Sequence, residues 1–137
     1  FPGGGLKDGE DEEDALRREL KEELGVLALE ILKPCGITRE LRHGIKGSDT
    51  VYLQTSIYYL CKVHAFGDQQ LEVREQLHGL EPRWVTIDDA LRQNESVIKD
   101  DLHQTKGLKT VLIRENHVLR TLKENNLCAN LKSSVSI

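Results

Sequence analysis

With 137 residues, 38% of them hydrophobic and 31% charged, the chain fits one ordinary globular domain. Its net charge of −4 argues against duplex nucleic acid or an anionic membrane surface as a partner, and no apolar run is long enough to cross a bilayer. Cys35, Cys61 and Cys128 are odd in number and widely spaced, which argues against a disulfide framework and indicates reduced thiols in a cytoplasmic protein.

The predicted elements begin with a glycine-rich irregular segment, residues 1–9, and a helix over residues 11–24. The helix has an acidic first turn and an apolar stripe, and Gly25 is a natural C-terminal cap. Residues 27–42 are expected to be extended and to turn over residues 43–49. Residues 50–64, the most β-rich stretch, then return as the second strand of a hairpin.

The second half is expected to contain two helices and one strand. The predictions are a polar loop with some helix (67–79), a short strand (83–87), a short helix from Asp88 capped by Thr86 or Asp88, a polar connection (93–106) and a helix (108–125). Residues 1–127 are assigned to the domain and 128–137 to a frayed tail. Strands and helices without regular βαβ alternation predict an α/β or α+β fold with a mixed sheet.

Three carboxylates gather at the wrong end of the first helix. Glu19, Glu22 and Glu23 are spaced i, i+3 and i+4, so they share one face, repel one another and meet the negative end of the helix dipole. A bound Mg²⁺ would resolve this conflict, and because Mg²⁺ fills its shell with water and substrate phosphate, the cluster also predicts a phosphate substrate. The alternative is a solvated acidic face.

The register of the upstream residues favours the metal. The chain reads Gly4, five residues, Glu10, seven residues, Arg18-Glu19-Leu20, one residue, Glu22-Glu23, one residue, Gly25-Val26. This resembles the Nudix box, GX5EX7REUXEEXGU with U an aliphatic residue, at all nine specified positions. Phe1-Pro2-Gly3 is similar to the family's usual lead-in.

The resemblance implies a fold and a set of site residues. The fold is the Nudix α/β/α sandwich with a mixed sheet, and because family members carry strands before the box, this chain is expected to lack its N-terminal strand or strands. By the resemblance, Glu19, Glu22 and Glu23 bind Mg²⁺ or Mn²⁺, often with the Gly3 carbonyl. Arg18 holds the carboxylates in place, and Glu10 supports the site. Glycines 3 to 5 let the backbone approach metal and phosphate closely.

The chemistry implied is metal-assisted hydrolysis of a diphosphate, in which a glutamate takes the proton of the attacking water. Glu22 or Glu23 is one candidate for this base. The other is a glutamate of the loop Leu71–Arg83, which holds Glu72, Glu75 and Glu81. Glu75 is favoured because it lies well inside the loop, although a solvated loop acid is an equal alternative.

The function expected is hydrolysis of a nucleoside diphosphate linked to another moiety, of nucleotide, ADP-ribose or nucleotide-sugar type. The alternative is a non-catalytic nucleotide sensor, but sensors typically lose box carboxylates, which this chain keeps. An isomerase of the same fold needs cysteine and glutamate placements that have no match here. The resemblance is also compatible with a homodimer.

Other residues rank lower as functional candidates. For Trp84 a place in the core is favoured over a base-stacking platform, and for Tyr52, Tyr58 and Tyr59 a place in the sheet or on its surface is favoured. Arg39, Arg42 and Lys46 are expected to serve the hairpin turn rather than a phosphate. The five histidines form no recognised metal motif.

Overall fold

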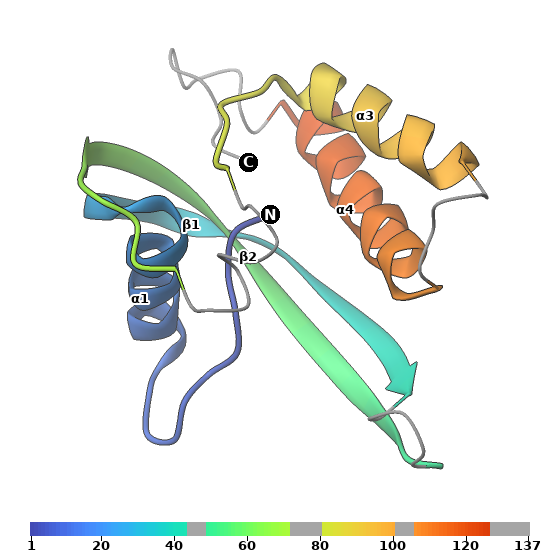
Figure 1. The fold of residues 1–137 in the computed structure, drawn as a ribbon, viewed down its shortest axis with the longest axis horizontal. Coiled ribbons are helices and arrows are strands. Elements are labelled where there is room, and N and C mark those ends of the chain that lie inside the picture. Colours follow the sequence, from blue (N-terminus) through green and yellow to red (C-terminus); the bar gives the residue numbers. More distant parts are fainter. Residues whose placement is uncertain (44–48, 72–80, 101–105, 127–137) are drawn as a thin grey trace. The chain divides into compact units, whose positions relative to one another are not determined.

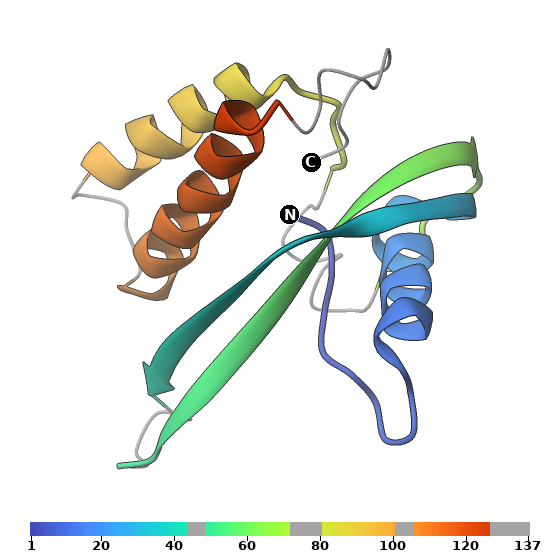
Figure 2. The same ribbon diagram turned by 180° about the vertical axis from the view of Figure 1, so that it is seen from behind.

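The computed structural model describes residues 1–43, 49–71, 81–100 and 106–126. These form helix α1 (Glu12–Leu24), strands β1 (Val26–His43) and β2 (Val51–Phe66), and helices α3 (Ile87–Lys99) and α4 (Lys106–Glu124). Figures 1 and 2 show β1 and β2 as one long twisted pair and α3 and α4 as neighbouring helices. This mixture confirms the predicted α/β class. Most of the predicted turn and the tail 128–137 lie outside the described residues.

The chain divides into two compact units. One contains Phe1–Glu30 and residues 63–137, and the other is Ile31–Lys62. In the first unit the described buried hydrophobic side chains come from α1, the start of β1 and α4, namely Ala15, Leu20, Val26, Val118, Leu119 and Leu122. No described helix is both long and apolar enough to span a membrane.

Helix α1 begins after an N-cap at Asp11 and ends at Gly25, the C-terminal cap that the sequence predicted. The Asp11 side chain accepts a hydrogen bond from the Asp14 N–H at 2.9 Å, and Asp11 itself is extended. At the other end Gly25 takes the left-handed conformation, φ 69°, and its N–H bonds to the carbonyls of Leu20 and Lys21. The two caps place the predicted glutamates in the last two turns.

The second unit consists of the turn-proximal parts of the two strands. Among the described residues, β1 and β2 form a two-stranded antiparallel sheet, as the hairpin prediction required. Arg42 Nη1 donates to Gln54 Oε1 at 3.0 Å across the pair, in keeping with a structural role for this arginine. Leu60 is buried, whereas Ile37, Leu41 and Leu53 are exposed.

Two predictions for the second half were wrong. Residues 83–86 form no strand, because within the described chain no strand lies beside them to complete a ladder. Residues 93–99, expected to be a polar connection, continue α3. Contacts with α4 override the weak helix propensity of this polar stretch: Asn94 Nδ2 donates to the buried Asn116 at 2.9 Å, and Glu95 pairs with Arg120 at 2.7 Å. Thr86 caps α3, as predicted.

Gly25→Ala is expected to lower the free energy of unfolding by about 3 kcal/mol, because two penalties add there. The left-handed conformation disfavours any Cβ, and a Cβ at this position would lie 2.2 Å from the Gly67 carbonyl oxygen. Gly9→Ala is the matched control, since Gly9 has φ 79° but open space around it. It should lose only about 1 kcal/mol in urea unfolding. Equal losses in the two variants would contradict the close approach at Gly25.

Candidate active site

The candidate site is built around the Arg18 guanidinium. Its Nε and Nη2 donate to the two Glu10 carboxylate oxygens at 2.8 and 3.0 Å. Its Nη1 donates to Glu19 at 2.7 Å and to Glu22 at 3.2 Å, and Nη2 also donates to the Gly5 carbonyl at 3.0 Å. One arginine therefore ties together the box loop, Glu10 and two of the three glutamates predicted to bind the metal.

The local charge in this group is unbalanced. Three carboxylates face one guanidinium, so the four side chains carry a net charge of −2. All four are more buried than exposed, with side-chain exposures of 14–28%. The hydrogen bonds from Arg18 lower the pKa of Glu10 to about 2 and raise the pKa of Arg18 above its ordinary value. Glu10 and Arg18 are therefore both charged at neutral pH.

The glycine segment folds back onto the last two turns of α1. The Gly3 N–H donates to Glu23 Oε2 at 2.9 Å, and Gly3 has φ 141°, a conformation that favours glycine. At Gly4 the backbone passes so close to the Glu19 carboxylate that a Cβ would lie 2.2 Å from Oε1. Glycine at position 4 thus leaves room for the Glu19 carboxylate, and the conformation at position 3 favours glycine.

The donor chemistry of this site fits a hard divalent cation. Glu19, Glu22 and Glu23 offer carboxylate oxygens from one rigid helix, and the group carries excess negative charge. In the part of the chain that the structure describes, however, no three His, Cys, Asp or Glu residues converge as a metal ion would need. Arg18 contacts Glu19 and Glu22 instead. Gly3 contacts Glu23 through its amide, so the predicted role of its carbonyl stays a prediction.

A second segment, residues 67–70, bonds to the C-terminal end of α1. The Gly67 N–H donates to the Gly25 carbonyl at 2.6 Å, and the Gln70 N–H donates to the Glu22 carbonyl at 2.9 Å. The Gln69 side-chain amide donates to the Glu23 carbonyl. These bonds satisfy carbonyl groups that a helix end leaves without intrahelical partners. They hold the end of β2 beside the glutamate-bearing turns.

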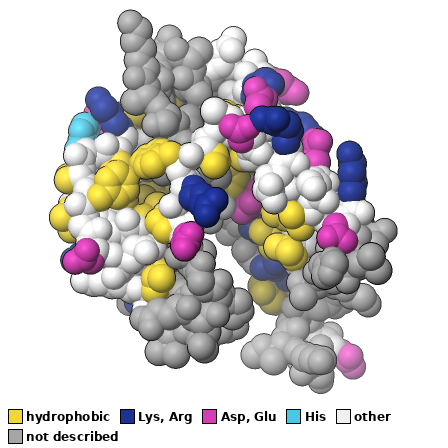
Figure 3. All heavy atoms as spheres, turned by 45° about the horizontal axis from the view of Figure 1, so that its top comes forward, with side chains coloured by type: hydrophobic (Ala, Val, Ile, Leu, Met, Phe, Trp, Pro, Cys, Tyr) yellow, Lys and Arg dark blue, Asp and Glu magenta, His cyan; other side chains and the backbone are white. Residues whose placement is uncertain are grey.

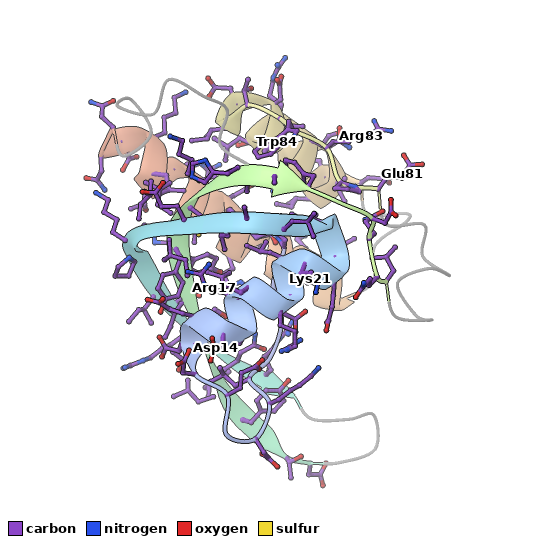
Figure 4. The ribbon with its side chains drawn as sticks, turned by 90° about the vertical axis from the view of Figure 1, so that its left-hand side faces the viewer. Asp14, Arg17, Lys21, Glu81, Arg83 and Trp84 are labelled. Carbon is purple, nitrogen blue, oxygen red and sulfur yellow. The ribbon has the colours of Figure 1, made fainter. Side chains whose placement is uncertain are left out.

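The face of α1 opposite to Glu19, Glu22 and Glu23 carries none of the predicted metal-binding side chains. Figure 4 shows Asp14, Arg17 and Lys21 following one another along that side of the helix. Arg17 Nη1 donates to the Leu29 carbonyl at 2.8 Å, which ties α1 to β1. Lys21 therefore lies on a different face from the three glutamates.

The loop that holds the alternative base is only partly described. Glu72 and Glu75 lie outside the described residues. Glu81 is exposed and pairs with Arg83 at 3.4 Å, close to where α3 begins. Of the other candidates, Tyr52 is exposed and Tyr58 and Tyr59 are half-buried, while Lys46 lies outside the described residues. The role of Glu75 as the general base therefore stays a prediction.

The core position predicted for Trp84 is wrong. Trp84 is 47% exposed and meets the ring of Phe66 edge to face, with ring centroids 5.9 Å apart. Figure 4 shows Trp84 beside the end of β2, on the segment that leads to α3. The predicted strand would have placed Trp84 in a sheet, and without that strand the ring stays at the surface. Sequence reasoning missed Phe66, whose only signal was its place at the end of the β-rich stretch.

Gly4→Ala is expected to displace the Glu19 carboxylate without unfolding the protein. The atoms that a Cβ would meet belong to the far end of a flexible side chain, so the loss in urea unfolding should stay below about 1 kcal/mol. The ¹³C chemical shift of the Glu19 carboxyl carbon reports the displacement. Gly5→Ala is the matched control, because a Cβ there meets nothing within 4 Å. An unchanged Glu19 signal in Gly4→Ala would rule out the contact.

Glu10→Gln is expected to remove a pH-dependent contribution to stability. Because the folded-state pKa of Glu10 is about 2 and its ordinary value is 4.5, the contribution is complete above pH 4.5 and is lost as pH falls towards 2. The difference between wild type and Glu10→Gln in urea unfolding should be constant near neutrality and shrink below pH 4.5. In an Arg18→Gln background the same substitution should have little pH-dependent effect. A difference that grows in acid would contradict the Glu10–Arg18 pair.

Comparison with protein families supports the motif. A family model described as the NUDIX domain matches residues 1–105. This range includes the whole candidate site, the hairpin and α3. No curated protein and no solved structure shows significant similarity to the chain.

Proposed function

The chain belongs to the NUDIX family, whose members are generally hydrolases of phosphoanhydride bonds, and we propose that it cleaves a nucleoside diphosphate linked to another moiety. The observation that carries the proposal is the Arg18 cluster, which consists of Arg18 with Glu10, Glu19 and Glu22. One guanidinium orders Glu19 and Glu22, while the glycine segment orders Glu23. These hydrogen bonds keep the three glutamates at the same end of α1, next to the glycine segment. We also propose a cytoplasmic location, on the cysteine pattern.

We propose that Glu19, Glu22 and Glu23 hold Mg²⁺ or Mn²⁺, with the Gly3 carbonyl as a further ligand. When bound, the metal would neutralise diphosphate charge and acidify a water molecule. The positive charge of Arg18 partly offsets carboxylate repulsion before any cation binds. Arg18 is thus a positioning residue, which acts through the glutamates that it contacts.

The reaction consumes one water molecule. A water oxygen forms a bond to one phosphorus, and the bond from that phosphorus to the bridging oxygen breaks. The products are a phosphomonoester of the nucleoside and a phosphorylated second moiety. A glutamate takes a proton from the water, and the candidates are Glu22 or Glu23 in α1 and Glu75 in the loop.

The test is a panel of nucleoside diphosphate derivatives incubated with Mg²⁺ and the full chain, with products separated by chromatography. Glu23→Gln should lower kcat by roughly 10²- to 10⁴-fold and leave the far-ultraviolet circular dichroism unchanged. Glu13→Gln is the matched control: it makes the same chemical change on the same helix, at an exposed position outside the cluster, and should keep wild-type turnover.

Glu75→Gln separates the two candidates for the base. If Glu75 takes the proton, its variant should lose turnover while the affinity for Mn²⁺ stays at the wild-type value. Wild-type turnover by Glu23→Gln would overturn the assignment of Glu23. Tight binding of a nucleotide without cleavage of any compound in the panel would replace the hydrolase with a nucleotide sensor.

A further inference from the structure

The second unit, Ile31–Lys62, carries an unusual set of exposed apolar side chains. Scattered apolar side chains are ordinary at a protein surface, and Figure 3 shows groups of them with single basic and acidic side chains between the groups. In the second unit, however, the four most exposed large hydrophobic residues follow the two-residue period of a strand. They are Ile37 and Leu41 in β1, and Val51 and Leu53 in β2, with exposed fractions of 61%, 72%, 52% and 59%.

These four residues share one face of the hairpin. Arg42 bonds to Gln54 across the two strands, and Gln54 bonds to Ser56 along β2, so the even-numbered residues near the turn point to one side of the sheet. The odd-numbered residues, which include all four aliphatic ones, therefore point to the other side. We name these four residues the apolar face.

The opposite face near the turn is mainly polar, although it is the less exposed of the two. Glu40 and Arg42 have side-chain exposures of 14% and 29% and form an ion pair at 3.4 Å. Thr38, Gln54 and Ser56 are half-buried on the same side. A sheet with one covered and one solvated face normally carries its apolar residues on the covered face. The apolar face thus has the composition of a covered surface.

The second unit contains no element of its own that could cover this face. Within its described residues it holds only parts of β1 and β2. Two strands alone are marginally stable in water, and an apolar sheet face needs a second layer. Two sheets can supply that layer for each other when they pack face to face. The same face of a second copy would therefore satisfy the requirement.

Exposed charges of opposite sign flank the part of the apolar face nearest the turn. Arg39 precedes Leu41 by two residues, on the side away from the turn, and Asp49 precedes Val51 by two residues, on the side of the turn. A second hairpin that packs in the reversed direction brings the Asp49 end of each copy to the Arg39 end of the other. This arrangement has a twofold axis, the commonest symmetry of protein dimers.

We propose that the apolar face packs against the same face of a second copy of this chain, in antiparallel orientation, with Arg39 of each copy paired to Asp49 of the other. Stable interfaces bury about 800 Å² on each partner and have an apolar centre with a polar rim. The apolar face supplies such a centre, and the two charges supply part of the rim. The dimer is independent of the proposed function, because no residue of the Arg18 cluster takes part in it.

The first experiment measures the dimer dissociation constant of the full chain by analytical ultracentrifugation, from about 1 μM to about 1 mM protein. Wild type should pass from monomer to dimer in this range. Leu41→Glu should raise the constant roughly 100-fold or more, because it places an unpaired charge in the apolar centre. Leu108→Glu is the matched control, since Leu108 is 41% exposed on α4, and it should dimerise as wild type does. A wild-type monomer at every concentration, or equal constants for Leu41→Glu and wild type, would overturn the proposal.

The second experiment tests the paired charges by reversing them. Arg39→Glu and Asp49→Arg each bring like charges together, so each should raise the dissociation constant roughly 5- to 50-fold. The double variant Arg39→Glu/Asp49→Arg restores opposite charges and should return to within about 3-fold of wild type. Recovery in the double variant separates a direct contact from a folding defect. Additive weakening in the double variant would overturn the antiparallel pairing.

Discussion

The contact between Arg18 and its carboxylates is the interaction on which the rest of the site depends. Glu19 and Glu22 stand at the negative end of a helix dipole and repel each other, so α1 alone would not hold them in place. Arg18 donates to both and to Glu10, and the planar guanidinium fixes direction as well as distance. Its bond to the Gly5 carbonyl brings the glycine segment into the same network. The helix and the loop before it therefore act as one ordered unit.

The end of α1 is a second constraint, and it links the cluster to the rest of its unit. Gly25 ends the helix in a left-handed conformation, which leaves its carbonyl pointing to Gly67. The carbonyls of Glu22 and Glu23 are satisfied by Gln70 and Gln69 in the same segment. Hydrogen bonds that simply complete a helix terminus thereby bring the end of β2 next to residues with a proposed metal role. The edge-to-face pair of Phe66 and Trp84 lies next to this junction, because Phe66 directly precedes the segment.

Prediction from sequence succeeded where local rules dominate and failed where distant partners decide. The cap at Gly25 and the shared face of the glutamates follow from backbone chemistry and helix periodicity. The extension of α3 through residues 93–99 was not predicted, because asparagine is a poor helix former. In the structure the Asn94 side-chain amide donates to Asn116, 22 residues away in α4, and this contact stabilises the extension. The predicted core position of Trp84 was wrong for a similar reason, because the predicted strand that holds it has no neighbouring strand in the described chain.

The sequence by itself determined which residues form the candidate site, because residue types and their spacing along one helix decide which carboxylates can share a face. It also determined the family, through a motif that local structure alone can build. Only the tertiary structure decided that Arg18 also donates to Glu10 and to the Gly5 carbonyl, and that Phe66 meets Trp84 beyond the helix end. These contacts join segments whose separation in the chain carries no periodic signal. Their partners are set by packing and by the need to satisfy buried or terminal polar groups.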